Sequence, residues 1–118
     1  MRQNEPLYVI SVAARLLELH PQTLRKYERE GFVAPSRTSG NLRLYSAEDL
    51  ESLRQVKHLV EKRGINLAGV ELALQVTKRL QRIHQQLSAL DGDEDSPLRG
   101  TINDLENTLR LLGYTVRR

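Results

Sequence analysis

The 118-residue sequence contains no cysteine and no tryptophan, and it has one phenylalanine and four tyrosines. Without cysteine the chain can form no disulfide bond, thiolate metal site or cysteine nucleophile. Aromatic residues make up only 4% of the chain, so they add little bulk to the core, and a chain this small often gains stability from a second subunit. The sequence also lacks a signal peptide and any apolar run of membrane-spanning length, and we therefore expect a cytoplasmic protein without a membrane partner.

Sequence signatures of common enzymes are missing as well. The chain has no phosphate-binding loop, no dinucleotide-binding fingerprint and no nucleophile elbow. Its three histidines, His20, His58 and His84, are too far apart to suggest a metal site by local spacing. We therefore expect neither an enzyme nor a protein that requires a metal or another cofactor.

Positive charge is present but unevenly distributed. The formal net charge is only +3, yet residues 1–64 carry 11 Lys/Arg against 8 Asp/Glu, whereas residues 65–118 carry 7 of each. Residues 20–45 alone hold five basic and two acidic side chains. Positive charge concentrated in one segment suits the phosphate backbone of a nucleic acid.

The first third of the chain predicts two short helices joined by a tight turn. Ser11 is a suitable N-cap for a helix over residues 12–19. Pro21 is tolerated as the first residue of a second helix, which should end near Glu30 because Gly31 suits the position after a helix. This arrangement is the helix-turn-helix motif. Apolar residues at helical spacing predict the buried stripe of the first helix, namely Val12, Leu16 and Leu19.

A short β-prone segment, Tyr8–Ile10, precedes these helices, and a tight hairpin over Pro35–Tyr45 follows them. The hairpin carries Arg37 and Arg43 on its two arms. A helix narrow enough for a major groove, beside a basic hairpin for the flanking backbone, indicates a winged helix-turn-helix that binds DNA sequence-specifically.

Three further helices are expected after the hairpin. Ser46 and Asp49 can form a capping box that opens a helix ending near residue 63. Asn66 can cap a long helix that continues to Leu90. An acidic linker over residues 91–100 should separate it from a last helix, capped by Thr101, that folds back and thickens a dimer contact.

The long helix carries apolar residues at heptad spacing, which predicts a seam between two chains. The seam runs from Val76 to Leu90, which is fifteen residues of helix. A helix of that length is marginal alone in water, so the seam needs a partner, and we expect a homodimer. The seam residues are Val76, Leu80, Ile83, Leu87 and Leu90.

Arg25 on the second helix is the leading candidate for a DNA contact, either to a guanine edge or to a phosphate. Lys26 and Arg29 suit backbone anchors. Gln22 and Thr23 fit either base contacts or capping of the helix, and His20 fits a cap or a position facing the nucleic acid. The hairpin adds two further candidate DNA contacts, Arg37 and Arg43. Two tyrosines complete the set of candidates: Tyr27, which suits packing with an added hydroxyl contact, and Tyr45, which suits a phosphate contact or the core.

Several of these residues, in this order, resemble the MerR family of bacterial transcription regulators. They are Tyr8–Ser11, Ala14, Thr23–Arg25, Tyr27–Glu28, Gly31, Pro35, Arg37, Arg43–Ser46, Asp49–Leu50 and Gly64. The resemblance covers residues 8–75. It implies a mostly α fold with a winged helix-turn-helix DNA-binding domain over 1–70. Residues 71–118 would then hold a short antiparallel dimerisation coiled coil and a C-terminal helix, and the dimer would bind an inverted repeat.

Within the family, Leu24–Gly31 and Arg63–Val70 resemble the heat-shock repressor branch, HspR. That resemblance implies repression of chaperone operons with the Hsp70 chaperone DnaK as co-repressor. The chain departs from other members in having Lys26 where many carry an aromatic residue, and in lacking the cysteines of the metal and redox sensors. Only 28 residues follow Leu90, so no small-molecule effector is expected.

Two alternatives remain at this point. A MerR-type activator that untwists a promoter spacer would use the same protein chemistry, and only promoter geometry separates it from a repressor. A small coiled-coil adaptor with an incidental basic face is the alternative from another class, and the two hairpin arginines argue against it.

Overall fold

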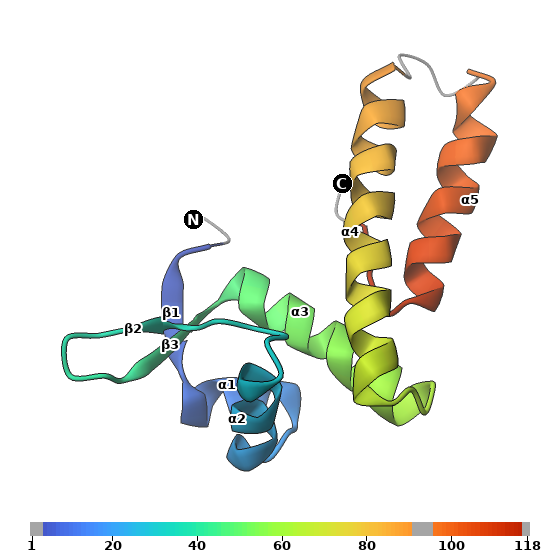
Figure 1. The fold of residues 1–118 in the computed structure, drawn as a ribbon. Helices are drawn as coiled ribbons and strands as arrows, with labels where there is room; N and C mark the ends of the chain where they lie inside the picture. The colour runs from blue at the N-terminus through green and yellow to red at the C-terminus, as the bar shows by residue number, and fades with distance from the viewer. Residues whose placement is uncertain (1–3, 91–95, 117–118) are drawn as a thin grey trace. The chain divides into compact units, whose positions relative to one another are not determined.

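The computed structural model describes residues 4–90 and 96–116. They belong to two compact units, Met1–Lys57 and His58–Arg118, called here the N-terminal and C-terminal units (Figure 1). Helices dominate and one small sheet accompanies them, which confirms the predicted mostly α class. The predicted functional division between residues 70 and 71 stays a prediction.

The N-terminal unit combines three strands with three helices. The strands form one antiparallel sheet in the order β1-β3-β2, in which Tyr8 pairs with Tyr45 and Arg37 with Arg43. Leu24, Tyr45 and Leu53 are completely buried in this unit. The elements are β1 Pro6–Val9, α1 Ile10–Leu17, α2 Pro21–Arg29, β2 Ser36–Arg37, β3 Arg43–Ser46 and α3 Ala47–Lys57.

The start of α1 and the face that it buries both differ from the prediction. It begins at Ile10 directly after β1, so Ser11 lies in its first turn, and the N-cap is Val9, which makes no side-chain cap bond. The buried residues are Ala13, Ala14 and Leu17, whereas Leu16, predicted to be buried, is 50% exposed. The prediction followed the larger apolar residues, but the small alanines lie on the face that the rest of the unit covers.

Helix α2 follows the prediction closely. It starts at Pro21 and ends at Arg29, and Gly31 adopts a left-handed conformation with φ 82°. The backbone N–H of Gly31 donates to the carbonyl of Glu28, and that of Phe32 donates to the carbonyl of Tyr27, both at 3.0 Å. These two bonds form the Schellman motif, which satisfies carbonyls that would otherwise lack partners at the helix end.

Helix α3 opens with the predicted capping box. The backbone N–H of Ser46 donates to Asp49 Oδ2 at 2.9 Å, and that of Asp49 donates to Ser46 Oγ at 3.0 Å. At its other end Lys57 Nζ donates to the carbonyl of Leu17 at 2.9 Å. This bond ties α3 to the end of α1 within the N-terminal unit.

The C-terminal unit contains a π-helical turn, η1 His58–Lys62, and two helices, α4 Leu67–Leu90 and α5 Leu98–Leu111. As predicted, Asn66 caps α4, because its Oδ1 accepts from the N–H of Gly69 at 2.8 Å. Helix α5 starts at Leu98 and not after Thr101; Pro97 occupies the N-cap position, and Ser96 Oγ accepts from the N–H of Leu98. The predicted linker is therefore shorter, and its residues 91–95 lie outside the described residues.

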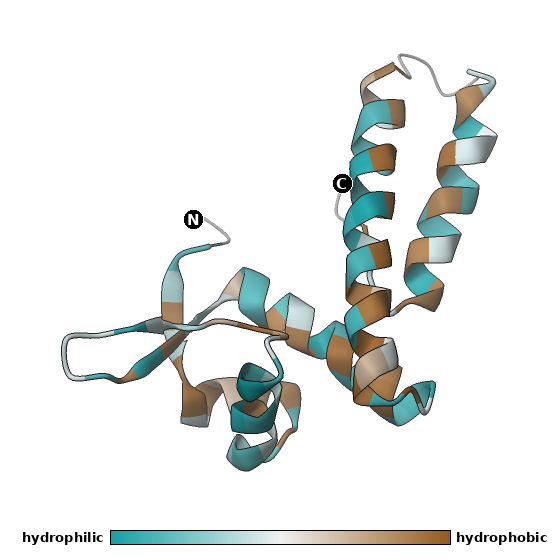
Figure 2. Cartoon of the chain, in the orientation of Figure 1, coloured by the Kyte–Doolittle hydropathy of each residue, from teal (hydrophilic) through white to brown (hydrophobic). Residues whose placement is uncertain are grey.

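Helices α4 and α5 lie side by side and turn apolar residues toward each other (Figure 2). Val70, Ala73 and Thr77 of α4 are buried, as are Ile102 and Leu109 of α5. His84 Nε2 and Glu106 Oε2 add a polar link between the helices at 2.8 Å. One face of α4 is thus covered within a single chain.

Gly113 closes α5 against the π-helical turn, and its substitution tests this packing. Gly113 has φ 83°, and an added Cβ would lie 2.7 Å from Cδ2 of the His58 ring. We expect Gly113→Ala to lower the free energy of unfolding by about 1–3 kcal/mol in a denaturant titration, because backbone strain and a steric clash coincide.

Gly100→Ala is the matched control, since among the described residues no atom outside the local helix backbone and the two chain neighbours lies within 4 Å of its added Cβ. Gly100 lies inside α5, where alanine stabilises a helix by roughly 0.5–1 kcal/mol relative to glycine. Equal destabilisation by both substitutions would contradict the packing of Gly113 against His58.

Candidate nucleic-acid interface

Helix α2 has one apolar and one polar face. Leu24 and Tyr27 are buried in the N-terminal unit, whereas Gln22, Lys26 and Arg29 are exposed. Arg25 is half-buried and lies on the same side as the exposed residues, because positions 22, 25, 26 and 29 follow the helical repeat. This face combines an amide, which can read a base edge, with three cations, and Thr23 lies half-buried beside it.

His20 caps the start of α2. Its Nδ1 accepts a hydrogen bond from the backbone N–H of Gln22 at 3.0 Å, and the side chain is exposed. An accepting Nδ1 leaves Nε2 as the protonated nitrogen of the neutral ring. The capping alternative therefore has a geometric basis, and a contact between His20 and DNA stays a prediction.

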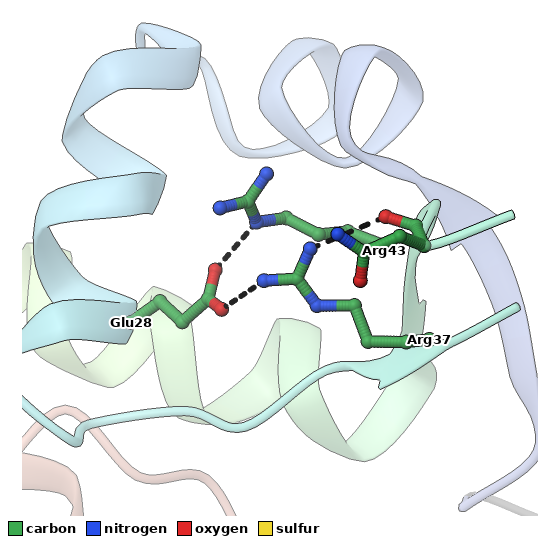
Figure 3. Close-up of polar contacts among 4 residues, drawn as sticks. Glu28, Arg37 and Arg43 are labelled. Carbon is green, nitrogen blue, oxygen red and sulfur yellow. Dashed lines mark hydrogen bonds and ion pairs between the residues drawn. The ribbon is translucent and has the colours of Figure 1, made fainter.

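The two hairpin arginines converge on Glu28 of α2 (Figure 3). Arg37 Nη2 donates to Glu28 Oε1 at 2.7 Å, and Arg43 Nε donates to Oε2 at 2.6 Å. Arg37 Nη1 also donates to the carbonyl of Asn41 at 3.3 Å. We call Glu28, Arg37 and Arg43 the wing cluster. In the sequence Glu28 stood out only among the residues that carry the family resemblance, and its position between the two hairpin arginines was not predicted.

The environment of Glu28 keeps its carboxyl ionised. Burial raises its pKa, but hydrogen bonds from Arg43 and Arg37, together with their positive charges, outweigh burial and hold the pKa below its usual value of 4.5. The Glu28 side chain is 20% exposed, so solvent screens the cluster less than it screens a fully exposed pair.

The two candidate tyrosines are buried. Tyr45 is completely buried, and within the described part of the chain its hydroxyl has no hydrogen-bond partner. Burial, followed by the negative charge of Glu28, raises the pKa of Tyr45. Tyr27 is 4% exposed, and its ring lies 5.9 Å from that of Phe32. Both tyrosines contribute to packing in this conformation, so the candidate interface does not depend on them.

The predicted seam residues of α4 differ in exposure. Val76, Ile83 and Leu90 are 40%, 44% and 74% exposed, whereas Leu80 and Leu87 are half-buried. Leu72, which the sequence analysis did not include, is 63% exposed and lies on the same side as Val76. We call Leu72, Val76, Ile83 and Leu90 the open stripe. Its role in dimerisation stays a prediction.

Among residues 4–90 and 96–116, no three His, Asp or Glu side chains lie close enough together to hold a metal ion. In the same part of the chain, no helix has the length and apolar character needed to cross a membrane.

Residues 8–77 match the family model described as the MerR helix-turn-helix family regulatory protein. The chain belongs to the MerR family. The matched range starts in β1, contains all of α2 and the β2–β3 hairpin, called here the wing, and ends within α4. The residues that carried the sequence resemblance therefore identified the family correctly.

Three relatives illustrate the similarity. The heat shock protein HspR of Streptomyces coelicolor is 52% identical over 96 residues, which cover 78% of this chain and 64% of HspR. The transcriptional regulator GlnR of Bacillus cereus is 37% identical over 73 residues, with coverage of 62% and 56%. The transcriptional repressor CarA of Myxococcus xanthus is 35% identical over 96 residues, with coverage of 72% and 33%. The chain spans 64% or less of each of these three relatives.

Proposed function

We propose that this MerR-family chain is a dimeric, sequence-specific DNA-binding repressor of heat-shock operons. The polar face of α2 is the observation that carries the proposal, because Gln22, Arg25, Lys26 and Arg29 share one side of a short helix. A helix-turn-helix inserts its second helix into the major groove. The wing cluster lies at the same helix and supplies further positive charge for the neighbouring phosphates.

Within this proposal the cations of α2 have different tasks. Arg25 has the planar, forked group that can bind a guanine edge through two hydrogen bonds. Lys26 and Arg29 are exposed and anchor the helix on the phosphate backbone. Gln22, near the helix start, is placed for a base contact.

The open stripe of α4 supports a homodimer. Four large apolar residues exposed along one side of a helix favour a partner surface. Pairing of two α4 helices in antiparallel orientation relates the two DNA-binding units by a twofold axis. The operator should then be an inverted repeat.

Repression of chaperone operons, with DnaK as co-repressor, is proposed from the similarity to HspR. Either the segment over residues 91–118 or the outer faces of the paired α4 helices would bind the chaperone. The proposal requires that DnaK binds the protein–DNA complex more tightly than the free protein, since only then does the chaperone strengthen operator binding.

Selection of genomic fragments tests this function directly. Protein immobilised without DnaK should retain fragments with an inverted repeat near chaperone genes, and a nuclease footprint should be symmetric about the repeat. Purified DnaK should increase operator affinity, and transcription in vitro should fall when both proteins are added.

Each contrary outcome removes a different part of the proposal. A rise in transcription, with binding inside an over-long promoter spacer, would identify an activator. Operator affinity that does not change with DnaK would eliminate the co-repressor. Failure to retain any fragment would remove DNA binding and favour an adaptor.

A further inference from the structure

Arg37 and Arg43 are direct cross-strand partners in the β2–β3 ladder. Two positive charges opposite each other on one face of a hairpin repel and destabilise it. A single carboxylate from α2 counters this repulsion, because Glu28 accepts one short hydrogen bond from each arginine. The wing cluster therefore carries a net charge of one positive unit, although the wing itself presents two guanidinium groups.

The two arginines differ in the donors that they retain. Arg37 uses one terminal nitrogen for Glu28 and the other for the carbonyl of Asn41. Arg43 uses only its Nε, and its terminal nitrogens make no hydrogen bond to another described residue. Figure 3 shows Arg43 meeting the Glu28 carboxylate through Nε, with no dashed contact at its terminal nitrogens. Arg43 thus keeps a free edge of its guanidinium group, whereas both terminal nitrogens of Arg37 are engaged.

We propose that Glu28 is a positioning residue of the wing, which limits the wing to about one phosphate contact and assigns that contact to Arg43. The inference rests on the proposed DNA-binding function. Affinity for DNA of any sequence depends on the number of phosphate charges that the protein neutralises. An acid that occupies one wing arginine therefore lowers affinity for the operator and for random DNA alike, because a phosphate contact carries no sequence information.

Glu28→Gln is the decisive substitution, because it removes the charge and keeps the size of the side chain. On random DNA we expect tighter binding and a salt slope steeper by about one, which adds roughly a threefold loss of affinity between about 50 and 200 mM salt. Operator affinity should rise by about the same factor, since the base contacts of α2 are unchanged. A salt slope that stays at the wild-type value, or weaker binding to random DNA, would overturn the proposal.

Glu30→Gln is the matched control. Glu30 lies at the C-cap of the same helix, is exposed, and forms no ion pair with another described residue. The change in net charge is identical, but the wing cluster remains intact, so the affinity for random DNA should stay within about twofold of wild type and the salt slope should not change. An equal rise of affinity and slope in both variants would show a general effect of charge and overturn the role of Glu28.

The two arginine variants test the assignment of the contact and do not depend on the folding of Glu28→Gln. Arg43→Gln should lower the salt slope on random DNA by about one, and Arg37→Gln should lower it by clearly less. Equal reductions, or the opposite order, would contradict the assignment to Arg43.

A measurement without DNA separates this inference from the proposed function. In the nuclear magnetic resonance spectrum of the free protein, the Arg43 Nε–H should be protected from solvent exchange in wild type and in Glu30→Gln, and unprotected in Glu28→Gln. An unprotected Arg43 Nε–H in wild type would show that the cluster does not form. Failure of the wild type to bind any DNA would remove the proposed function, even if the protection pattern were as expected.

Discussion

An Ile83→Asp variant is expected to sediment as a monomer and to lose about 10²–10⁴-fold in operator affinity, because two linked DNA-binding units would become independent. Ile83 lies near the middle of the open stripe and is 44% exposed in the single chain. In a dimer it would be covered, and a carboxylate buried there without a partner is strongly unfavourable. Sedimentation equilibrium and a mobility shift on the operator would measure the two effects.

Gln75→Asp provides the control for this substitution. Gln75 is exposed on the same helix and lies about 100° around the axis from Val76, away from the centre of the open stripe. Gln75→Asp introduces the same charge as Ile83→Asp but outside the open stripe, so dimer association and operator affinity should be retained. An intact Ile83→Asp dimer would refute the proposed interface. We do not expect Ile83→Asp to unfold the chain, because Ile83 is not among the buried residues of α4. A monomer would therefore report on the interface between two chains.

Local chemistry in the sequence predicted much of the fold. The capping box of Ser46 and Asp49, the cap at Asn66 and the end of α2 at Gly31 each depend on residues within one helical turn. Such motifs can be read from spacing, because the side chain and the backbone group that it satisfies are neighbours in the chain.

The predictions were wrong where burial or a helix boundary depends on contacts that the local spacing does not reveal. The burial of Ala13 and Ala14 on α1 depends on the elements packed against it, and side-chain size favoured Leu16 instead. Helix α5 starts at Leu98, whose N–H donates to Ser96 Oγ, although Thr101 offers the same chemistry three residues later. Spacing alone could not choose between these two hydroxyl groups.

The same contrast between local and distant residues applies to the candidate sites. Helical periodicity identified the polar face of α2, because every residue of that face belongs to a single helix. The wing cluster joins positions 28, 37 and 43 through a hairpin and a helix, so the pairing of Glu28 with both arginines could not be read from spacing. On α4, heptad spacing found Val76, Ile83 and Leu90 but did not distinguish the side covered by α5 from the open stripe.

Binding of the wild-type dimer to its operator should weaken steeply with salt. A dimer that makes about 6–10 phosphate contacts loses about 10³–10⁵-fold in affinity between about 50 and 200 mM salt. Lys26, Arg29 and Arg43 of each subunit account for about six contacts, so we expect the lower end of this range. A mobility-shift titration at several salt concentrations gives the slope, and an affinity that does not change with salt would remove the electrostatic basis of the interface.

Alanine substitutions on α2 then separate phosphate contacts from base reading. Lys26→Ala should weaken binding to operator and random DNA alike and lower the salt slope by about one, because an exposed lysine acts as a point charge. Arg25→Ala should cost about 1–3 kcal/mol on the operator and relax the preference at one position, because its forked donors read a base. An equal loss on random DNA would identify Arg25 as a second phosphate anchor and leave Gln22 as the base-reading side chain on this face.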